Sequence, residues 1–141
     1  MTVVAWQSGI QALVGKVIQT GAFESLVMPV FDNNSLISSR FSVSRFEGII
    51  EGQGSTASPL LKRFVPRRAR DVINIGDIVV TSGMGGIYPA GINIGRVSGV
   101  IFLEYETTLE VEIVPMIDFS RLEYVFVIEA EREIETGNPD G

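Results

Sequence analysis

The sequence predicts an all-β protein built from short strands, and three observations lead to this prediction. Helical periodicity is almost absent, whereas apolar runs of strand length recur along the chain with turn-forming residues between them. Glycine is frequent in the connecting segments, and one strand–loop–strand pattern occurs twice. Many short strands joined by glycine-rich turns are typical of barrels and sandwiches. We therefore expect two small β-barrels in tandem.

The expected strands are bounded by turn signals such as Asp32-Asn33-Asn34-Ser35 and the loop Gly52-Gln53-Gly54-Ser55. Leu109, Val111 and Ile113 alternate with glutamates, the period-2 pattern of a half-buried strand. Tyr124–Ile128 is an unbroken apolar run, which predicts a buried strand. The other strands are expected at Leu26–Phe31, Leu36–Val43, Glu47–Glu51 and Leu60–Val65.

A weak internal repeat divides the chain. Thr2-Val3-Val4 precedes Val14-Gly15-Lys16-Val17, and Ile78-Val79-Val80 precedes Ile94-Gly95-Arg96-Val97. The first blocks are offset by 76 residues and the second by 80, so the later copy has the longer loop. Each unit predicts a strand, a loop and a returning strand with a glycine, which often marks a bulge or a tight barrel corner. We predict barrels at 1–70 and 71–131, followed by a disordered polar tail at 132–141.

The composition excludes several kinds of chemistry. Of the 141 residues, 45% are apolar and 20% charged, a globular balance, and no stretch reaches the roughly 20 apolar residues that span a bilayer. The chain contains no cysteine and no histidine. Disulfides, thiolate catalysis, sulfur-based zinc sites and a Ser-His-Asp triad are therefore ruled out. We expect no metal and no cofactor.

The net charge of −6 is distributed unevenly. Residues 1–70 contain eight Lys or Arg and four Asp or Glu, whereas residues 71–141 contain three and thirteen, so the halves carry +4 and −10. Such halves could steer head-to-tail self-contact or attract a charged partner, and ordinary solvated surfaces are the alternative. We expect no nucleic-acid partner, because phosphate neutralisation dominates that kind of binding.

The glycine-rich segment Gly83–Gly86 invites comparison with a phosphate-binding loop. Such a loop needs a following helix and usually a lysine. Here Tyr88-Pro89 and then a strand follow, and no lysine occurs after Lys62. We therefore interpret these glycines as turn and barrel-corner positions.

Only one catalytic arrangement for a hydrolase is compatible with this composition. Ser55 and Ser82 lie in glycine-flanked loops where a nucleophile could be exposed, and Lys16 and Lys62 are the only lysines, so a Ser-Lys dyad would be required. Four acidic residues of the second half, Glu104, Glu106, Glu110 and Glu112, are interpreted as strand-edge and solvent-facing charges. We expect the protein not to be an enzyme.

Four ordered blocks resemble the MreC family of rod shape-determining proteins. The main block runs from Gly76 to Val97, and the others are Leu13–Val17, Gly48–Gly52 and Asp118–Val125. Together they span nearly the whole chain, which makes the resemblance more specific than a lone glycine-rich loop. The structural signature within them consists of Gly15, Gly83, Gly85, Gly86, Pro89, Gly91 and Gly95.

The resemblance implies a fold and a role. MreC proteins have a short cytoplasmic end, one membrane helix, a coiled coil, and a two-barrel β-domain outside the membrane. This domain is similar to chymotrypsin-like proteases, without their catalytic residues. The implied function is a non-enzymatic scaffold of the cell-elongation complex, at the periplasmic or extracytoplasmic face of the cytoplasmic membrane. The implied partners are a homo-oligomer, a class B penicillin-binding transpeptidase, MreD and MreB. A small-ligand or cell-wall-polymer binding module is the alternative.

The start of the chain suggests a fragment, because Met1 runs almost directly into the strand-like pattern Thr2–Trp6. The membrane helix and coiled coil of the family are absent, so membrane attachment would require a missing N-terminal helix. The family pattern also implies a strand before Met1, which leaves the completeness of the first barrel open.

Two sets of residues are candidates for partner binding. Arg67, Arg68 and Arg70 follow Pro66 in the expected connection between the barrels, and could engage an acidic protein, anionic lipid or wall polymers. A solvated linker is the alternative. Among the aromatic residues of the first half, which include Trp6 and Phe64, the candidates are Phe41 and Phe46, because polar residues separate them. Core packing is the alternative for these aromatics.

Overall fold

The computed structural model describes residues 1–56, 59–102 and 104–128. The regular elements in these ranges are ten strands and three short 3-10 helices, which confirms the predicted all-β class. The tail that was expected to be disordered, 132–141, lies outside the described residues.

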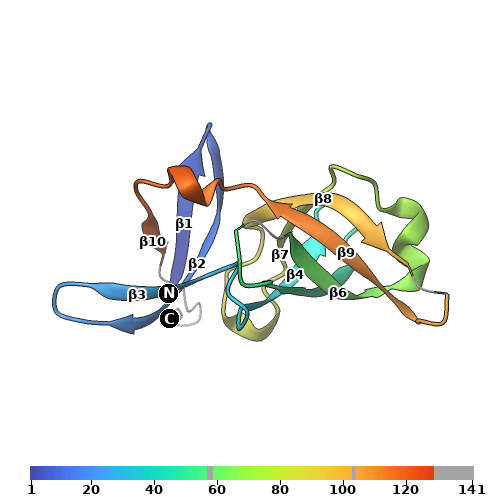
Figure 1. Cartoon of the computed structure of the whole chain (residues 1–141), viewed down its shortest axis with the longest axis horizontal. Helices are drawn as coiled ribbons and strands as arrows, with labels where there is room; N and C mark the ends of the chain where they lie inside the picture. Colours follow the sequence, from blue (N-terminus) through green and yellow to red (C-terminus); the bar gives the residue numbers. More distant parts are fainter. Residues whose placement is uncertain (57–58, 103, 129–141) are drawn as a thin grey trace, which may run out of the picture.

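Six antiparallel strands close into a barrel in the order β4-β5-β6-β9-β8-β7 (Figure 1). Closure pairs both edges of every strand, so this part of the chain has no free sheet edge. In chain order the strands are β4 (Leu36–Phe41), β5 (Glu47–Glu51), β6 (Leu60–Pro66), β7 (Ile78–Thr81), β8 (Asn93–Ile101) and β9 (Thr108–Pro115).

A four-stranded antiparallel sheet lies beside the barrel, in the order β10-β1-β2-β3 (Figure 1). Its strands are β1 (Thr2–Gln7), β2 (Ile10–Thr20), β3 (Ser25–Pro29) and β10 (Phe126–Ile128). The last strand pairs with the first, with Val4 opposite Phe126. The two ends of the described chain therefore meet in one sheet, and β3 and β10 are its edges.

Three 3-10 helices connect the strands. The helix η1 (Arg67–Val72) joins β6 to β7, η2 (Met84–Gly86) lies in the β7–β8 loop, and η3 (Phe119–Arg121) lies between β9 and β10. In Figure 1, η1 lies at the end of the barrel that is remote from the four-stranded sheet.

The internal repeat is confirmed as two hairpins with the same pairing. In β1–β2, Val3 lies opposite Gly15, and the register shifts directly after Val3. In β7–β8, Val79 lies opposite Gly95, and the register shifts directly after Val79. The two copies thus share the glycine and the irregularity beside it, as the sequence indicated.

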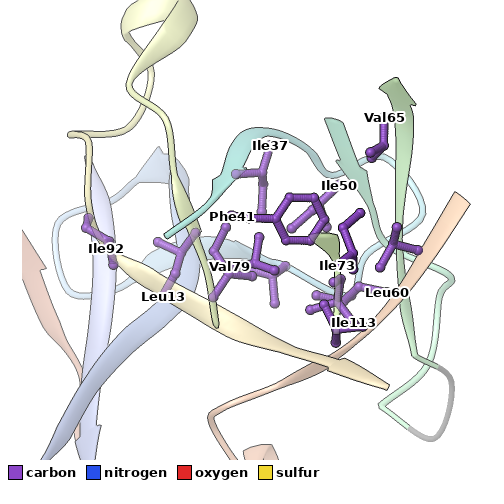
Figure 2. Packing of buried hydrophobic residues seen from close by; sticks show 14 of the residues in the cluster. Leu13, Ile37, Phe41, Ile50, Leu60, Val65, Ile73, Val79, Ile92 and Ile113 are labelled. Carbon is purple, nitrogen blue, oxygen red and sulfur yellow. The ribbon is translucent and has the colours of Figure 1, made fainter. Parts of the chain in front are cut away.

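The main hydrophobic core fills the barrel. Figure 2 shows Phe41 among Ile37, Ile50 and Ile73 in this interior. The period-2 pattern of β9 is confirmed, because Leu109, Val111 and Ile113 are fully buried. A second, smaller cluster packs on the sheet and contains Val3, Ala5, Ala12, Val14 and Ile117.

The barrel does not follow the expected division into 1–70 and 71–131. Strands β4, β5 and β6 come from before residue 70, and β7, β8 and β9 from after it, yet all six belong to one closed barrel. The first three strands of the chain belong to the other sheet together with β10. The described residues therefore form one closed barrel and one open sheet. The repeated hairpins belong to different sheets. The β1–β2 hairpin is flanked by β10 and β3, whereas the β7–β8 hairpin is flanked by β4 and β9.

Candidate interaction surfaces

A groove of about 380 Å³ lies on the four-stranded sheet where β1 meets β10. We call it the aromatic groove. Three aromatic side chains are its largest components, and they are 56%, 78% and 55% exposed in chain order. The lining residues are Trp6, Gln7, Arg121, Leu122, Glu123, Tyr124 and Phe126.

The alternation of β1 explains why Trp6 reaches solvent. Val3 and Ala5 pack in the small cluster, whereas Val4 faces the barrel core. Trp6 shares the face of Val4 but lies two residues further along, where the barrel no longer covers it. The sequence did not distinguish this position from a core aromatic, because hydrophobicity alone does not report where covering elements end.

The prediction that Tyr124–Ile128 forms a buried strand was wrong in its burial. Only Phe126–Ile128 is a strand, and Phe126 and Val127 are about half exposed. This strand is an edge with β1 as its neighbour, so its apolar run faces solvent on much of its surface.

Two hydrogen bonds join Gln7, which lines the aromatic groove, to the backbone of Asp118. The Gln7 Nε2 donates to the Asp118 carbonyl at 3.0 Å, and the Asp118 N–H donates to Gln7 Oε1 at 2.8 Å. Asp118 caps η3 by accepting from the N–H and the hydroxyl of Ser120. These hydrogen bonds from Ser120 lower the pKa of the Asp118 carboxyl, and Arg121 adds to the effect. The segment that connects β9 to β10 is thus bonded at Asp118 to the end of β1.

The arginine candidates lie together on η1. The guanidinium carbons of Arg67 and Arg70 lie 4.5 and 3.9 Å from the centre of the Phe102 ring, and that of Arg68 lies 5.3 Å from Phe46. Arg67 also donates to the carbonyls of Glu104 and Glu106, both at 2.8 Å.

Arg67 therefore holds the β8–β9 loop against the barrel. In the described parts of the chain, none of these three arginines forms an ion pair with a carboxylate. Their binding role stays a prediction.

The two aromatic candidates have different positions. Phe41 is 1% exposed in the barrel core, so the candidate role for it as a surface contact was wrong. It faces inward because β4 alternates and Ile37 and Ser39 share its buried face. Phe46 is partly buried against the core and has Arg68 over its ring, which leaves its predicted role untested.

The signature glycines of the strands permit close approach of backbones. A Cβ at Gly15 would clash with the carbonyl of Met28 on β3, and one at Gly95 with that of Val114 on β9. These two glycines hold the equivalent positions of the repeated hairpins.

The signature residues of the β7–β8 loop shape its turns instead. Gly83, Gly85, Gly86 and Gly91 all have φ between 73° and 88°, which glycine adopts without strain. The buried Thr81 hydroxyl ties the base of the loop, since it donates to the Pro89 carbonyl at 2.6 Å and accepts from the Ile92 N–H at 2.9 Å.

A Ser-Lys pair does exist, but inside the barrel. Lys62 Nζ donates to Ser39 Oγ at 2.5 Å, and Ser39 Oγ donates to the Gly48 carbonyl at 3.1 Å. Both side chains are fully buried, and Nζ lies 5.0 Å from the centre of the Phe41 ring. Burial lowers the pKa of Lys62 to about 7, and the nearby Glu47 opposes this shift. No substrate reaches a pair enclosed in this way.

Ser82, one of the two serines considered as a nucleophile, takes part in a hydrogen bond of its own loop. Ser82 Oγ accepts from the Met84 N–H at 3.2 Å, and Lys62 is bonded to Ser39 instead. Within the described ranges, no three acidic residues gather as a metal site would require. No helix in those ranges has the length and hydrophobicity to cross a membrane.

The fold and its surfaces define an all-β barrel domain with exposed aromatic side chains and a group of arginines on η1. The family model described as "Rod shape-determining protein MreC, barrel core" matches residues 1–129. The chain belongs to the MreC family, and this confirms the resemblance carried by the sequence blocks.

Individual relatives agree with the family match. The Cell shape-determining protein MreC of Geobacillus stearothermophilus is 30% identical over 132 residues, which cover 89% of this chain and 45% of the relative. The chain thus spans less than half the length of that protein. The crystal structure of MreC from Pseudomonas aeruginosa superposes with a TM-score of 0.77 at 27% identity, covering 88% of this chain and 76% of that one.

A second solved structure shows the same fold at lower identity. It is a complex between the penicillin-binding protein PBP2 and MreC from Helicobacter pylori. Its MreC is 24% identical, with a TM-score of 0.58, and the match covers 82% of this chain and 67% of that chain.

Proposed function

We propose that this chain is a non-enzymatic scaffold domain of a complex that determines bacterial cell shape, acting outside the cytoplasmic membrane. Membership of the MreC family and the enclosed position of the Ser-Lys pair support this role. We propose that the protein acts anchored to that membrane. Self-association and contacts with MreD and MreB belong to the same proposal.

The partner that we propose for the aromatic groove is the extracytoplasmic part of a class B penicillin-binding transpeptidase. The single observation that carries this assignment is the exposure of Trp6, Tyr124 and Phe126 around one groove. Exposed aromatics of this kind are typical anchors of protein interfaces. The Helicobacter pylori complex supports the class of partner.

A binding titration against the cognate transpeptidase, at low and high salt, tests the assignment. We expect saturable binding that changes little with salt, because the groove is mainly apolar. Trp6→Ala and Phe126→Ala should each weaken it by about tenfold, the scale of an interface anchor. Tyr105→Ala is the matched control, since Tyr105 is 81% exposed on the distant β8–β9 loop.

Unchanged affinity in both groove variants would remove the groove from the proposal. Binding to soluble wall fragments, without binding to the transpeptidase, would instead favour the alternative of a wall-polymer module, because aromatic faces can also pack against sugars.

A further inference from the structure

Phe64 has a backbone conformation that aromatic residues usually avoid. Its φ is +64°, in the left-handed region, where the Cβ atom crowds the backbone. It lies in β6, whose pairing with β9 shifts between Lys62 and Val65. Arg63 and Phe64 together therefore oppose the single residue Glu110. This arrangement is a β-bulge, and bulges redirect side chains.

The bulge turns Phe64 out of the barrel. Strict alternation from the buried Lys62 would place Phe64 inside and Val65 outside. Instead Val65 is fully buried and Phe64 is 64% exposed. Gly48 on β5 makes room for the bulge, because a Cβ there would lie 2.5 Å from the Arg63 carbonyl oxygen. The fold thus combines a strained residue and a dedicated glycine to display one aromatic ring, and such strain is found most often at functional sites.

A second groove, of about 320 Å³, lies beside this ring on the β6–β9 face of the barrel. We call it the Phe64 groove. Its lining residues are Arg63, Phe64, Ile101, Glu106, Thr108 and Glu110. The Phe64 groove shares no lining residue with the aromatic groove.

The lining of the Phe64 groove contains two carboxylates, Glu106 and Glu110, and one guanidinium, so its formal charge is −1. The one cation of the lining, Arg63, is already bound, with Nε 2.8 Å from Glu51 and Nη1 3.4 Å from Glu110. Glu106 forms no ion pair with any residue that the structure describes. The lining thus combines a net negative charge with an exposed aromatic ring.

We propose that the Phe64 groove binds an extended, basic segment of a partner protein. One apolar side chain of the segment would pack on Phe64, and a lysine or arginine would lie against Glu106 and Glu110. Charge complementarity selects this occupant over an acidic or neutral one, and the aromatic ring supplies the apolar anchor. The proposal does not depend on the transpeptidase contact, because it concerns a different face and different residues.

A short peptide of alternating lysine and leucine is the probe, and the matched peptide has glutamate in place of lysine. Both are titrated into the isotope-labelled chain and followed by amide chemical shifts. We expect the lysine peptide to shift resonances of residues 63–65 and 106–110, and the glutamate peptide to shift none of them.

Phe64→Asn is the main variant, because asparagine tolerates the left-handed conformation and removes the ring. It should keep the melting temperature of the parent and weaken peptide binding by about tenfold. Phe23→Ala is the control, since Phe23 is fully exposed at the distant β2–β3 turn. The double variant E106Q/E110Q tests the charges independently, and should reduce both the affinity and its salt dependence.

Equal binding of the two peptides, or unchanged binding in both Phe64→Asn and E106Q/E110Q, would overturn the proposal. So would concentration-dependent dimerisation that Phe64→Asn abolishes while the lysine peptide fails to bind, because the occupant would then be a second copy of the chain.

Discussion

Lys62 places an ionisable group inside the barrel. Its side chain is fully buried, and its pKa falls from 10.5 to about 7 because burial disfavours the charged ammonium group. Unfolded chains keep the lysine pKa near 10.5, so between about pH 7 and 10.5 the unfolded state binds more protons. Lys62 therefore makes the protein more stable as the pH rises through this window. Below about pH 7 both states are protonated, and the full cost of burying the charge is present.

We predict that Lys62→Met raises the free energy of unfolding at neutral pH by about 1–4 kcal/mol, because an apolar side chain of similar length removes a buried charge. The gain should shrink as the pH rises toward 10. Urea unfolding at several pH values, for both proteins, measures this difference. The pH values used should stay below 10. Burial raises the pKa of Tyr88 to about 12, so above pH 10 the tyrosine ionises in the unfolded chain but not in the folded one, and this lowers stability.

The Ser39→Ala variant provides a control for Lys62→Met. It removes the hydrogen-bond partner of Lys62 but keeps the amine, so the rise of stability with pH should remain. If Lys62→Met kept the same rise, the assignment of this pH dependence to Lys62 would be wrong.

At the scale of elements, the repeated hairpins depend on how closely neighbouring strands approach. In β8, a side chain at Gly95 would enter the backbone of β9. At Gly99, on the same strand, a Cβ would have only the flexible end of the Glu112 side chain within 3 Å. Glycine is thus strictly required at position 95 and only weakly required at position 99.

We predict that Gly95→Ala lowers the free energy of unfolding by about 3 kcal/mol, because the β8–β9 pair must separate to admit a methyl group. Gly99→Ala is the matched control and should change stability by less than about 0.5 kcal/mol, because the Glu112 carboxylate can move. Thermal unfolding of the two variants compares them directly. Equal losses at both positions would show that strand propensity, rather than the close approach, requires these glycines.

At the scale of the whole molecule, closure of the barrel joins the two halves of the sequence. The strand β4 pairs with β7, and β6 pairs with β9. These pairings cross the boundary at residue 70, as does the pairing of β1 with β10. Each half by itself would therefore leave long strand edges and much of the core exposed.

We predict that residues 1–70 alone do not fold cooperatively, because half of a closed barrel cannot bury its interior. Circular dichroism and thermal unfolding of this fragment should show no sharp transition. Mixing this fragment with residues 71–141 should restore a sharp transition if the two fragments can assemble. A cooperative transition in the isolated first fragment would instead support an independent first barrel, the arrangement that the internal repeat favours.

The sequence alone determined the fold class, most strand positions and the repeated hairpins, because alternation, turn residues and glycine spacing are local signals. The β9 strand was predicted from Leu109, Val111 and Ile113, and the signature glycines from the resemblance to the MreC family. The family resemblance rested on the same local blocks.

Only the tertiary structure decided which strands share a barrel and which aromatics reach solvent. Phe41 is in the core and Trp6 is half exposed, although both are large apolar residues in strands. Phe64 is outside only because of a bulge that local alternation does not predict. Strand pairing and side-chain exposure depend on contacts between segments far apart in the chain, and a local pattern is compatible with many such contacts.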